Sequence, residues 1–494
     1  MNSNQSAQEP RALPLPVALL PILALVLIMG SAVLLFGADP HVPLLMSTVV
    51  SVIIGLIYGH KWKDIQSLII ESVSSVSETV LILMLIGGLV AMWIVSGTVP
   101  AMVYYGLKVI NPSFFLVTSC ALCCIVSVAC GSSWTTAATV GIALMGIGAG
   151  LGINPAMTAG SVVSGSFFGD RLSPLSDITN LTSAVTKVNL FEHIRHMIYT
   201  SAPALILAMI IYFFLGLQYS SDSMDMSTIY SMQQTLAANF DLNPILLLPP
   251  VLVVLMVVFR VPAIPGLAGG IALGGVFFIF FQGGLQMGFS ASFQTIIECI
   301  NYGAVVETGD AFIDGLLTRG GIQGMLYTIS LMICAMVFGG SLEQIGSLRV
   351  VSDKLLNLAR GTGSLVLVTI LSCILTNALT GDVYLSLMIP GRMYSNEYKK
   401  RGLQGKNLSR ALEDGGAVSS CFFPWNACGS YMSSTLGVSC AAYVPFAFVN
   451  LITPIVSILF AYAGITIIKM TKEEWAQAKA QLAETGEPSL SEER

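Results

Sequence analysis

The segment Phe168-Gly-Asp-Arg-Leu-Ser-Pro-Leu-Ser-Asp-Ile-Thr-Asn180 directly follows an apolar run that begins at Pro155. It places two carboxylates, a guanidinium, several hydroxyls and an amide inside otherwise hydrophobic sequence. Pro174 lacks a backbone N–H and clashes with the preceding turn, so we expect helix geometry to fail near Asp170 to Ser173. Backbone carbonyls freed at membrane depth must be buried in protein or face a water-filled cavity. The segment therefore predicts a broken helix with a polar site at the break.

Most of the chain is hydrophobic enough to make lipid its main solvent. Of the 494 residues, 54% are hydrophobic and 10% are charged, and the mean hydropathy is +0.80. A soluble domain has about a quarter charged residues. Apolar runs recur from Pro16 to Ile468, and several are too short to cross a membrane alone, which is typical of discontinuous or re-entrant helices. We therefore expect an all-α polytopic membrane protein with about 11 to 14 transmembrane segments.

Two pairs of matching segments predict that the chain is duplicated. Ala159 to Phe168 aligns without gaps with Asp414 to Phe423, and each is followed at once by a helix-breaking Gly or Pro. Upstream, and in the same order, Cys130 to Trp134 aligns with Thr380 to Tyr384. Chance similarity between Gly-, Ser- and Phe-rich helices is the alternative for any single match, whereas matches in one order favour a repeat.

The positions of lysine and arginine indicate how the two halves are oriented. The basic loop Arg392 to Arg410 corresponds to the uncharged loop Gly150 to Asn154, so we expect equivalent loops to face opposite sides of the membrane. Because basic loops lie on the cytoplasmic side, both termini are expected inside and the halves are expected to be inverted-topology repeats. The expected organisation is a cytoplasmic N-terminal tail (1–15), a first transmembrane repeat (16–217), an external linker (218–243), a second, inverted repeat (244–468) and a cytoplasmic C-terminal tail (469–494).

The first polar break admits two interpretations. In one, Asp170 and Asp177 supply hard anionic oxygens for Na+ or accept a proton. Arg171 then pairs with one of these carboxylates or, as a planar fork, with an anionic substrate. In the other, the break is a cytoplasmic loop with an ordinary surface ion pair, because Lys187 is close in sequence.

The matching break in the second half, Phe423-Pro-Trp-Asn-Ala-Cys-Gly-Ser430, carries no charge. It offers Asn426, Ser430 and freed backbone carbonyls. Neutral oxygens beside the carboxylates of the other half would suit Na+. Trp425 is equally compatible with an aromatic anchor at the membrane interface.

Two further polar insertions occupy equivalent places, Gly131-Ser-Ser-Trp-Thr-Thr136 and Thr376-Asn-Ala-Leu-Thr-Gly-Asp382. A carboxylate between apolar runs is costly, so Asp382 is a functional hypothesis by default, whereas Glu78 and Glu343 are weaker candidates. The candidate Na+ ligands are Asp170, Asp177, Asp382 and Asn426. The wider set of substrate- or ion-binding candidates is Ser133, Trp134, Asp170, Arg171, Ser173, Ser176, Asp177, Thr179, Asn180, Asn377, Thr380, Asp382, Asp414, Trp425, Asn426 and Ser430.

A mechanism follows from the electrostatics of such carboxylates. A carboxylate that is partly removed from water holds a proton more readily, and can exchange it for a sodium ion near neutral pH. Competition for one carboxylate is enough for antiport. Mutual exclusion also predicts that the apparent affinity for Na+ falls as the pH falls.

At these residues the sequence resembles the NhaC-type sodium/proton antiporter family, within the wider superfamily of inverted-repeat ion transporters. Most of the chain, from the first span to Ile468, follows that layout. Where the family usually has a Thr beside the Trp motif, this chain has Ser132-Ser133. The residues that carry the resemblance are Gly131-Ser-Ser-Trp134, Gly169-Asp-Arg-Leu-Ser-Pro-Leu-Ser-Asp177 with Thr179-Asn180, Gly381-Asp382, and Glu413-Asp-Gly-Gly416 with Pro424-Trp-Asn426.

The resemblance implies a secondary active antiporter of the bacterial cytoplasmic membrane, with Na+ and H+ as its substrates and without a bound organic cofactor. The family also includes carriers similar to the malate/lactate antiporter. The alternative is therefore Na+-coupled transport of a small organic acid or an amino acid, and Arg171 with the hydroxyl-rich breaks leaves room for it.

Other classes of protein fit the sequence less well. A channel would have a repeated pore motif from several subunits, and an enzyme would need a motif such as H-E-x-x-H, a nucleophile elbow or a Walker A lysine, which we do not find. His193 and His196 are expected in a loop and not as a pair of metal ligands. The lipid bilayer is the expected environment, and no basic cluster indicates a nucleic-acid partner. A homodimer is compatible with the sequence.

Overall fold

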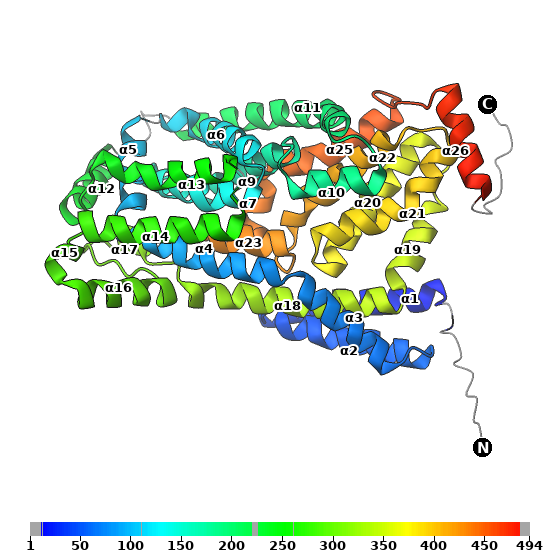
Figure 1. Cartoon of the computed structure of the whole chain (residues 1–494), viewed down its shortest axis with the longest axis horizontal. Coiled ribbons are helices and arrows are strands. Elements are labelled where there is room, and N and C mark those ends of the chain that lie inside the picture. Colours follow the sequence, from blue (N-terminus) through cyan, green and yellow to red (C-terminus); the bar gives the residue numbers. More distant parts are fainter. Residues whose placement is uncertain (1–10, 12, 110, 220–225, 260, 485–494) are drawn as a thin grey trace, which may run out of the picture.

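The computed structural model describes residues 11, 13–109, 111–219, 226–259 and 261–484. Within these ranges the secondary structure is helical, and β-structure is limited to an isolated bridge between Leu403 and Lys469. Figure 1 shows an elongated bundle in which most long helices run along the longest axis of the molecule. The predicted all-α fold is confirmed.

The helices of the described residues fall into two series, before and after the segment around residues 220–225. The first series is α1 (Leu15–Phe36), α2 (His41–Ile57), α3 (Trp62–Ser75), α4 (Ser77–Val95), α5 (Thr98–Val109), α6 (Phe115–Cys130), α7 (Ser133–Thr136), the π-helix η2 (Ala137–Gly141), α8 (Ile142–Gly150), α9 (Pro155–Arg171), α10 (Asp177–Thr186) and α11 (Leu190–Gly216). The second series is α12 (Met226–Asn239), α13 (Leu248–Val258), α14 (Ala263–Phe281), α15 (Gly284–Met287), α16 (Phe289–Tyr302), α17 (Ala311–Leu317), α18 (Ile322–Gln344), α19 (Ser347–Leu356), α20 (Thr362–Thr380), α21 (Val383–Lys400), α22 (Gly405–Leu412), the π-helix η5 (Glu413–Ala417), α23 (Ala427–Leu436), α24 (Cys440–Tyr443), α25 (Phe448–Tyr462) and α26 (Lys472–Glu484).

Seven helices among the described residues are long and apolar enough to cross a membrane, or nine if each of two bent pairs forms one span. The bent pairs are Tyr230–Asn239 with Pro244–Met256, at 100°, and Cys440–Phe446 with Phe448–Tyr462, at 57°. These bends agree with the expected discontinuous helices. The number lies below the expected 11 to 14 because that estimate counted every broken segment as a crossing. Helices such as α9 and α21 contain many polar residues, so they are not counted among the helices that are long and apolar enough to cross a membrane.

Glycine and a capping side chain produce each of the two upstream breaks. Gly131 follows α6 with φ +69° and Gly381 follows α20 with φ +70°, a left-handed conformation that glycine adopts without a steric penalty. Ser132 then caps α7 by accepting a hydrogen bond from a backbone N–H at 3.2 Å, and Asp382 caps α21 in the same way at 3.0 Å. At Gly131 a Cβ would lie 2.6 Å from the Cβ of Leu175, so the two breaks of the first half touch.

The two downstream breaks lie at the predicted prolines. Helix α9 ends at Arg171 and α10 begins at Asp177, on either side of Pro174. The equivalent gap precedes α23, which Asn426 caps by accepting a hydrogen bond from the Cys428 N–H at 3.0 Å. Helix α10 packs against α21, and α23 packs against η2, so the segment after the break in each half contacts the split helix of the other.

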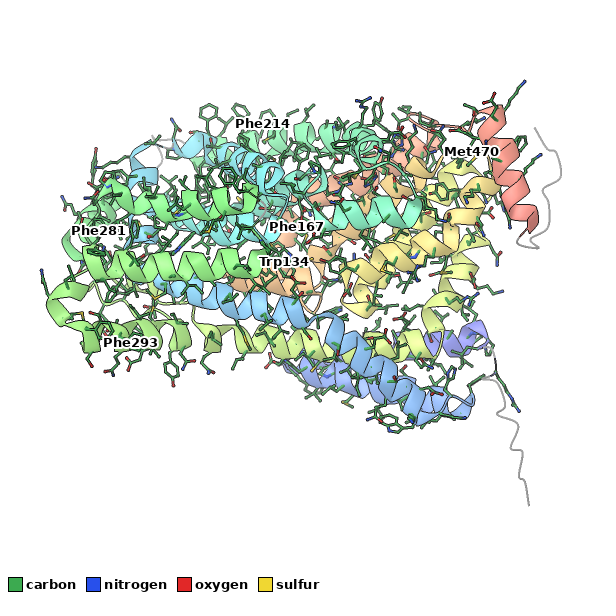
Figure 2. The ribbon with its side chains drawn as sticks, in the orientation of Figure 1. Trp134, Phe167, Phe214, Phe281, Phe293 and Met470 are labelled. Atoms are coloured by element: carbon green, nitrogen blue, oxygen red, sulfur yellow. The ribbon has the colours of Figure 1, made fainter. Side chains whose placement is uncertain are left out.

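Apolar side chains cover the outside of the bundle as well as its core. Figure 2 shows Phe214 and Phe293 projecting from opposite edges of the molecule, whereas Trp134 and Phe167 lie in its interior. Phe214 is 63% exposed and Phe167 is 1% exposed. Exposed apolar surface of this extent suits contact with lipid chains, and the chain is a multi-pass membrane protein. Helices α1 and α26 lie toward the same end of the bundle in Figure 1.

Candidate functional site

A cavity of about 390 Å³ lies where the broken helices of both halves meet. Its walls come from α4, the α6–α7 junction, the end of α9, the starts of α10 and α21, α14 and α23. The cavity brings together six of the residues proposed from the sequence, namely Ser133, Trp134, Asp170, Ser176, Asp177 and Asp382.

Two aspartates are nearly buried in the wall of this cavity. Asp170, at the end of α9, is 6% exposed, and its Oδ2 accepts a hydrogen bond from the Ser133 backbone N–H at 3.1 Å. Asp382 is 5% exposed, and its Oδ1 accepts from the Leu385 N–H at 3.0 Å. Nearby donors also include the Ser176 hydroxyl for Asp170 and the Tyr384 backbone N–H for Asp382. A carboxylate has about four lone-pair sites, so each group keeps acceptor capacity for a bound ion.

Two further carboxylates line the same cavity from more exposed positions, Asp177 at the start of α10 and Glu78 on α4. Within the part of the chain that the structure describes, no lysine, arginine or histidine lines the cavity. A lining with four carboxylates favours a cation over an anion. Among the described residues, no three His, Cys, Asp or Glu side chains converge closely enough to hold a metal ion together.

An aromatic wall completes the cavity. The rings of Trp134 and Tyr431 stack with centroids 4.1 Å apart and an interplanar angle of 17°, and the Tyr431 hydroxyl donates to the Trp134 carbonyl at 2.7 Å. Tyr384 also lines the cavity. The sequence analysis did not propose Tyr384 or Tyr431. Tyr431 could have been found from helical spacing, because it lies on the same face of α23 as Ala427 and Cys428, directly after the predicted break.

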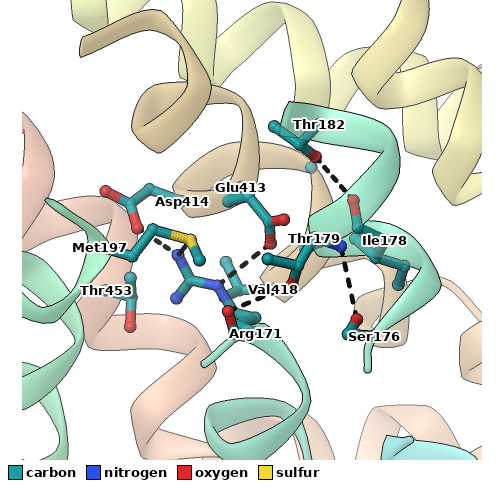
Figure 3. Close-up of polar contacts among 12 residues, drawn as sticks. Arg171, Ser176, Ile178, Thr179, Thr182, Met197, Glu413, Asp414, Val418 and Thr453 are labelled. Carbon is teal, nitrogen blue, oxygen red and sulfur yellow. Dashed lines mark hydrogen bonds and ion pairs between the residues drawn. The ribbon is translucent and has the colours of Figure 1, made fainter. Parts of the chain in front are cut away.

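Arg171 does not line the cavity. Figure 3 shows its guanidinium directed at Glu413 and Asp414, in a separate cluster. Its Nη2 donates to Asp414 Oδ1 at 2.5 Å, and its Nε lies 3.5 Å from Glu413 Oε2. The guanidinium therefore does not pair with Asp170 or Asp177, as one interpretation expected, but with carboxylates of the second half. These three ionic side chains are buried, so the alternative of a surface ion pair is also wrong. Asp414 belongs to this cluster and does not line the cavity.

The remaining proposed residues stabilise the breaks and do not line the cavity. Asn426 donates to Asn377 Oδ1 at 3.1 Å, and Asn377 donates to the Gly416 carbonyl at 2.6 Å, so these amides join η5 to the two breaks of the second half. Trp425 donates to the Ala378 carbonyl at 2.8 Å. The other residues outside the cavity lining, each bonded to nearby chain, are Ser173, Thr179, Asn180, Thr380 and Ser430.

The two histidines expected in a loop are instead buried in α11. Asn189 caps this helix by accepting from the Phe191 N–H at 3.0 Å, so helix geometry begins before His193 and His196. Both imidazoles face protein and are buried. Asn189 is a typical N-cap residue, so the sequence did contain a signal for the start of this helix. The aromatic and charged residues around it led instead to the prediction of a loop.

Comparison with known proteins places these features in context. The sequence model of the family described as the Na+/H+ antiporter family matches residues 165–465. The Na(+)/H(+) antiporter NhaC of Alkalihalophilus pseudofirmus is 39% identical over 432 residues, covering 87% of this chain and 92% of that protein. The malate-2H(+)/Na(+)-lactate antiporter of Bacillus subtilis is 35% identical over 436 residues, covering 88% and 92%. The arginine/ornithine antiporter ArcD of Halobacterium salinarum is 34% identical over 469 residues, covering 94% and 95%.

Proposed function

Because the chain belongs to the Na+/H+ antiporter family, we propose that it is a secondary active transporter that exchanges Na+ for H+ across the bacterial inner membrane. The observation that carries this function is the cavity at the broken helices, whose described lining contains four carboxylates and no basic side chain. Intramembrane carboxylates are costly and mark ion pathways. A cation is the substrate that such a cavity would hold best.

Asp170 and Asp382 are the groups proposed to bind Na+. Each lies at a helix break and keeps lone pairs beyond those that its protein donors use. Discontinuous helices of secondary transporters bind their coupling ions at such breaks. Asp177 is proposed to attract the ion from its more exposed position. Protons and Na+ compete for the negative charge of the site, so that the protein carries one or the other during alternating access.

The cavity size supports a second candidate, the Na+-coupled transport of an amino acid. A volume of about 390 Å³ and the stacked Trp134 and Tyr431 exceed what a single ion needs, and aromatic faces attract organic cations. A small dicarboxylate such as malate fits less well. Arg171, the group considered as its partner, is occupied by Asp414 and Glu413 outside the cavity.

The proposed orientation has both termini in the cytoplasm. The end of α21 carries Lys399 and Lys400, and Arg401 begins the α21–α22 connection. This region lies toward the same end of the bundle as α26 (Figure 1). Basic connections mark the cytoplasmic side. Alternating access would then open the cavity toward this end and toward the opposite end, near α12 and α15, in turn.

Transport by the purified protein in liposomes tests the function. A Na+ gradient is imposed, and the interior pH is recorded with and without malate, lactate or arginine. We expect Na+ alone to drive proton flux. Flux that requires an added organic solute would contradict Na+/H+ exchange. A requirement for arginine would favour the amino-acid transporter, and a requirement for malate or lactate would favour an organic-acid transporter.

A further inference from the structure

A second group of ionisable side chains is buried beside the cavity but does not line it. Its members are contributed by both halves of the chain, and each is at most 2% exposed. Helix α9 contributes one, α11 one, α22 one and the π-helix η5 two. The members of this buried cluster are Arg171, His193, Arg410, Glu413 and Asp414.

Two neighbouring carboxylates of the buried cluster differ in their bonding. Asp414 Oδ1 accepts from Arg171 Nη2 and from the Thr200 hydroxyl, the latter at 3.1 Å. Among the residues that the structure describes, neither oxygen of Glu413 has a hydrogen-bond partner. Its Oε2 lies 3.5 Å from Arg171 Nε, and its Oε1 lies 3.6 Å from His193 Nε2. Glu413 is therefore a buried acid whose acceptor capacity is unused, which is unfavourable unless a hydrogen is supplied.

His193 faces Glu413 with an unused ring nitrogen. The Ser409 hydroxyl donates to the Lys406 carbonyl at 3.1 Å, so its oxygen accepts from His193 Nδ1, 2.8 Å away. A neutral imidazole in this tautomer has a bare Nε2, and Nε2 has no hydrogen-bond partner. An unprotonated ring nitrogen and a carboxylate oxygen without a hydrogen-bond donor then face each other. One proton between them would convert the contact into a charge-assisted hydrogen bond.

The charges around this pair leave room for one positive charge. Next to the pair, Arg171 and Arg410 oppose three buried carboxylates, Asp170, Glu413 and Asp414, so this local group of side chains carries one unbalanced negative charge. Such an imbalance is costly. The other titratable groups around the pair are His196 on α11, Lys406 and the exposed Glu192 at the surface, and Tyr398 on α21, while α20 and α25 contain no charged residue.

We propose that the His193–Glu413 pair is a proton-binding site separate from the cation cavity. Na+ at Asp170 and H+ on this pair would each balance the same excess negative charge, so either would disfavour the other without a shared ligand. Helix α9 links the two sites, because Asp170 lines the cavity and the next residue, Arg171, contacts Glu413. The inference rests on the Na+/H+ exchange proposed above and assigns its proton to specific side chains.

Helix α11 reaches the protein surface directly before the pair. Glu192 precedes His193, is 65% exposed and lies 4.0 Å from Lys406 Nζ. The proposal has the proton enter from this side of the bundle. The cavity would load Na+ by a different path.

His193→Gln and Glu413→Gln test the proposal, because each keeps a polar side chain but cannot ionise. The full-length protein is purified, and proton release on addition of Na+ is recorded with a pH indicator in weak buffer. The same variants are assayed in liposomes for exchange of 22Na+ against Na+, which needs no proton. We expect Na+-triggered proton release to fall at least about tenfold, with Na+/Na+ exchange within about twofold of the unsubstituted protein.

His196→Gln is the matched control, because this buried histidine lies on the same helix and has no carboxylate within ion-pair distance in the described structure. It should keep both proton release and Na+/Na+ exchange. Unchanged proton release in His193→Gln and Glu413→Gln would overturn the proposal and assign the proton to the cavity carboxylates. Loss of Na+/Na+ exchange in both variants would also count against it. An unsubstituted protein that exchanges Na+ for Na+ but releases no proton would contradict Na+/H+ exchange itself.

Discussion

Asp170 and Arg171 are consecutive residues whose side chains serve different sites. The carboxylate lines the cation cavity, whereas the guanidinium neutralises Glu413 and Asp414 in the buried cluster. Both lie in the last turn of α9, just before the break. Substitutions at the two positions should therefore have different consequences, one for ion binding and the other for folding.

Asp170→Asn should abolish transport while the protein stays folded. Asparagine keeps an oxygen that can accept from the Ser133 N–H, but it removes the negative charge. We expect the rate of Na+/H+ exchange in liposomes to fall at least about tenfold, because the charge that binds the ion is lost. Asp353→Asn removes an exposed carboxylate outside the cavity and should leave the rate unchanged. Equal activity of both variants would place Asp170 outside the transport pathway.

Arg171→Met should destabilise the fold. It leaves Glu413 and Asp414 buried without their shared cation, and breaking a buried ion pair by removing one partner costs about 3–5 kcal/mol. The measurement is the free energy of unfolding in detergent. Lys406→Met is the control, since its partner Glu192 is 65% exposed and such pairs contribute about 0–1 kcal/mol. A similar loss of unfolding free energy in the two variants would show that burial of the Arg171 ion pairs does not increase their contribution to stability.

At the scale of elements, the caps of the broken helices recur at one spacing. Gly131 and Gly381, Ser132 and Asp382, and Ser176 and Asn426 are each 250 positions apart. This spacing also places Pro174 on Pro424. We propose that the two halves are inverted repeats in this register. The sequence match of Ala159 to Phe168 with Asp414 to Phe423 implies a spacing five residues longer, because Gly, Ser and Phe recur along both helices and permit several gapless matches.

Gly131→Ala should disrupt the first-half break. Alanine in the left-handed conformation costs about 1–2 kcal/mol, and its Cβ would lie 2.6 Å from the Cβ of Leu175. We expect a lower melting temperature in detergent and slower Na+/H+ exchange. Gly324→Ala, in the first turn of α18, has open space for its Cβ and should be neutral or slightly stabilising. A Gly131→Ala protein with unchanged stability would contradict the close contact between the two first-half breaks.

The C-terminal helix α26 should detach from the bundle in acid. The Gln404 amide, and then the Thr471 backbone N–H, hold the pKa of Glu474 below its ordinary value of 4.5. A carboxylate whose pKa is lowered by docking stabilises the docked state above that ordinary value and loses this effect as the pH falls through the lowered pKa. Trp475 fluorescence should report the change. Glu474→Gln should remove this pH dependence, whereas Glu473→Gln should not.

At the scale of the whole molecule, local sequence predicted the breaks and distant contacts decided the roles of the side chains. Pro174, Gly131 and Gly381 carry their own backbone preferences, so each break could be located from the sequence. The partner of Arg171 could not, because Asp414 lies 243 positions away and nothing near either residue indicates the other. Similarly, Asn426 was proposed as a Na+ ligand from its place at a break, but its amide is used by Asn377 and the cap of α23.

Exchange through alternating access makes a prediction for the complete transporter. If Na+ and H+ exclude one another, lowering the pH fills the proton site and reduces the fraction of protein that can bind Na+. The Na+ concentration for half-maximal 22Na+ uptake should therefore rise as the pH falls, by up to about tenfold per pH unit, with the maximal rate less affected. This holds whether the proton binds at Asp170 or at the His193–Glu413 pair. In Glu413→Gln, however, the half-maximal concentration should lose its pH dependence only if the proton binds at the pair. A half-maximal concentration independent of pH in the unsubstituted protein would contradict mutual exclusion of the two ions.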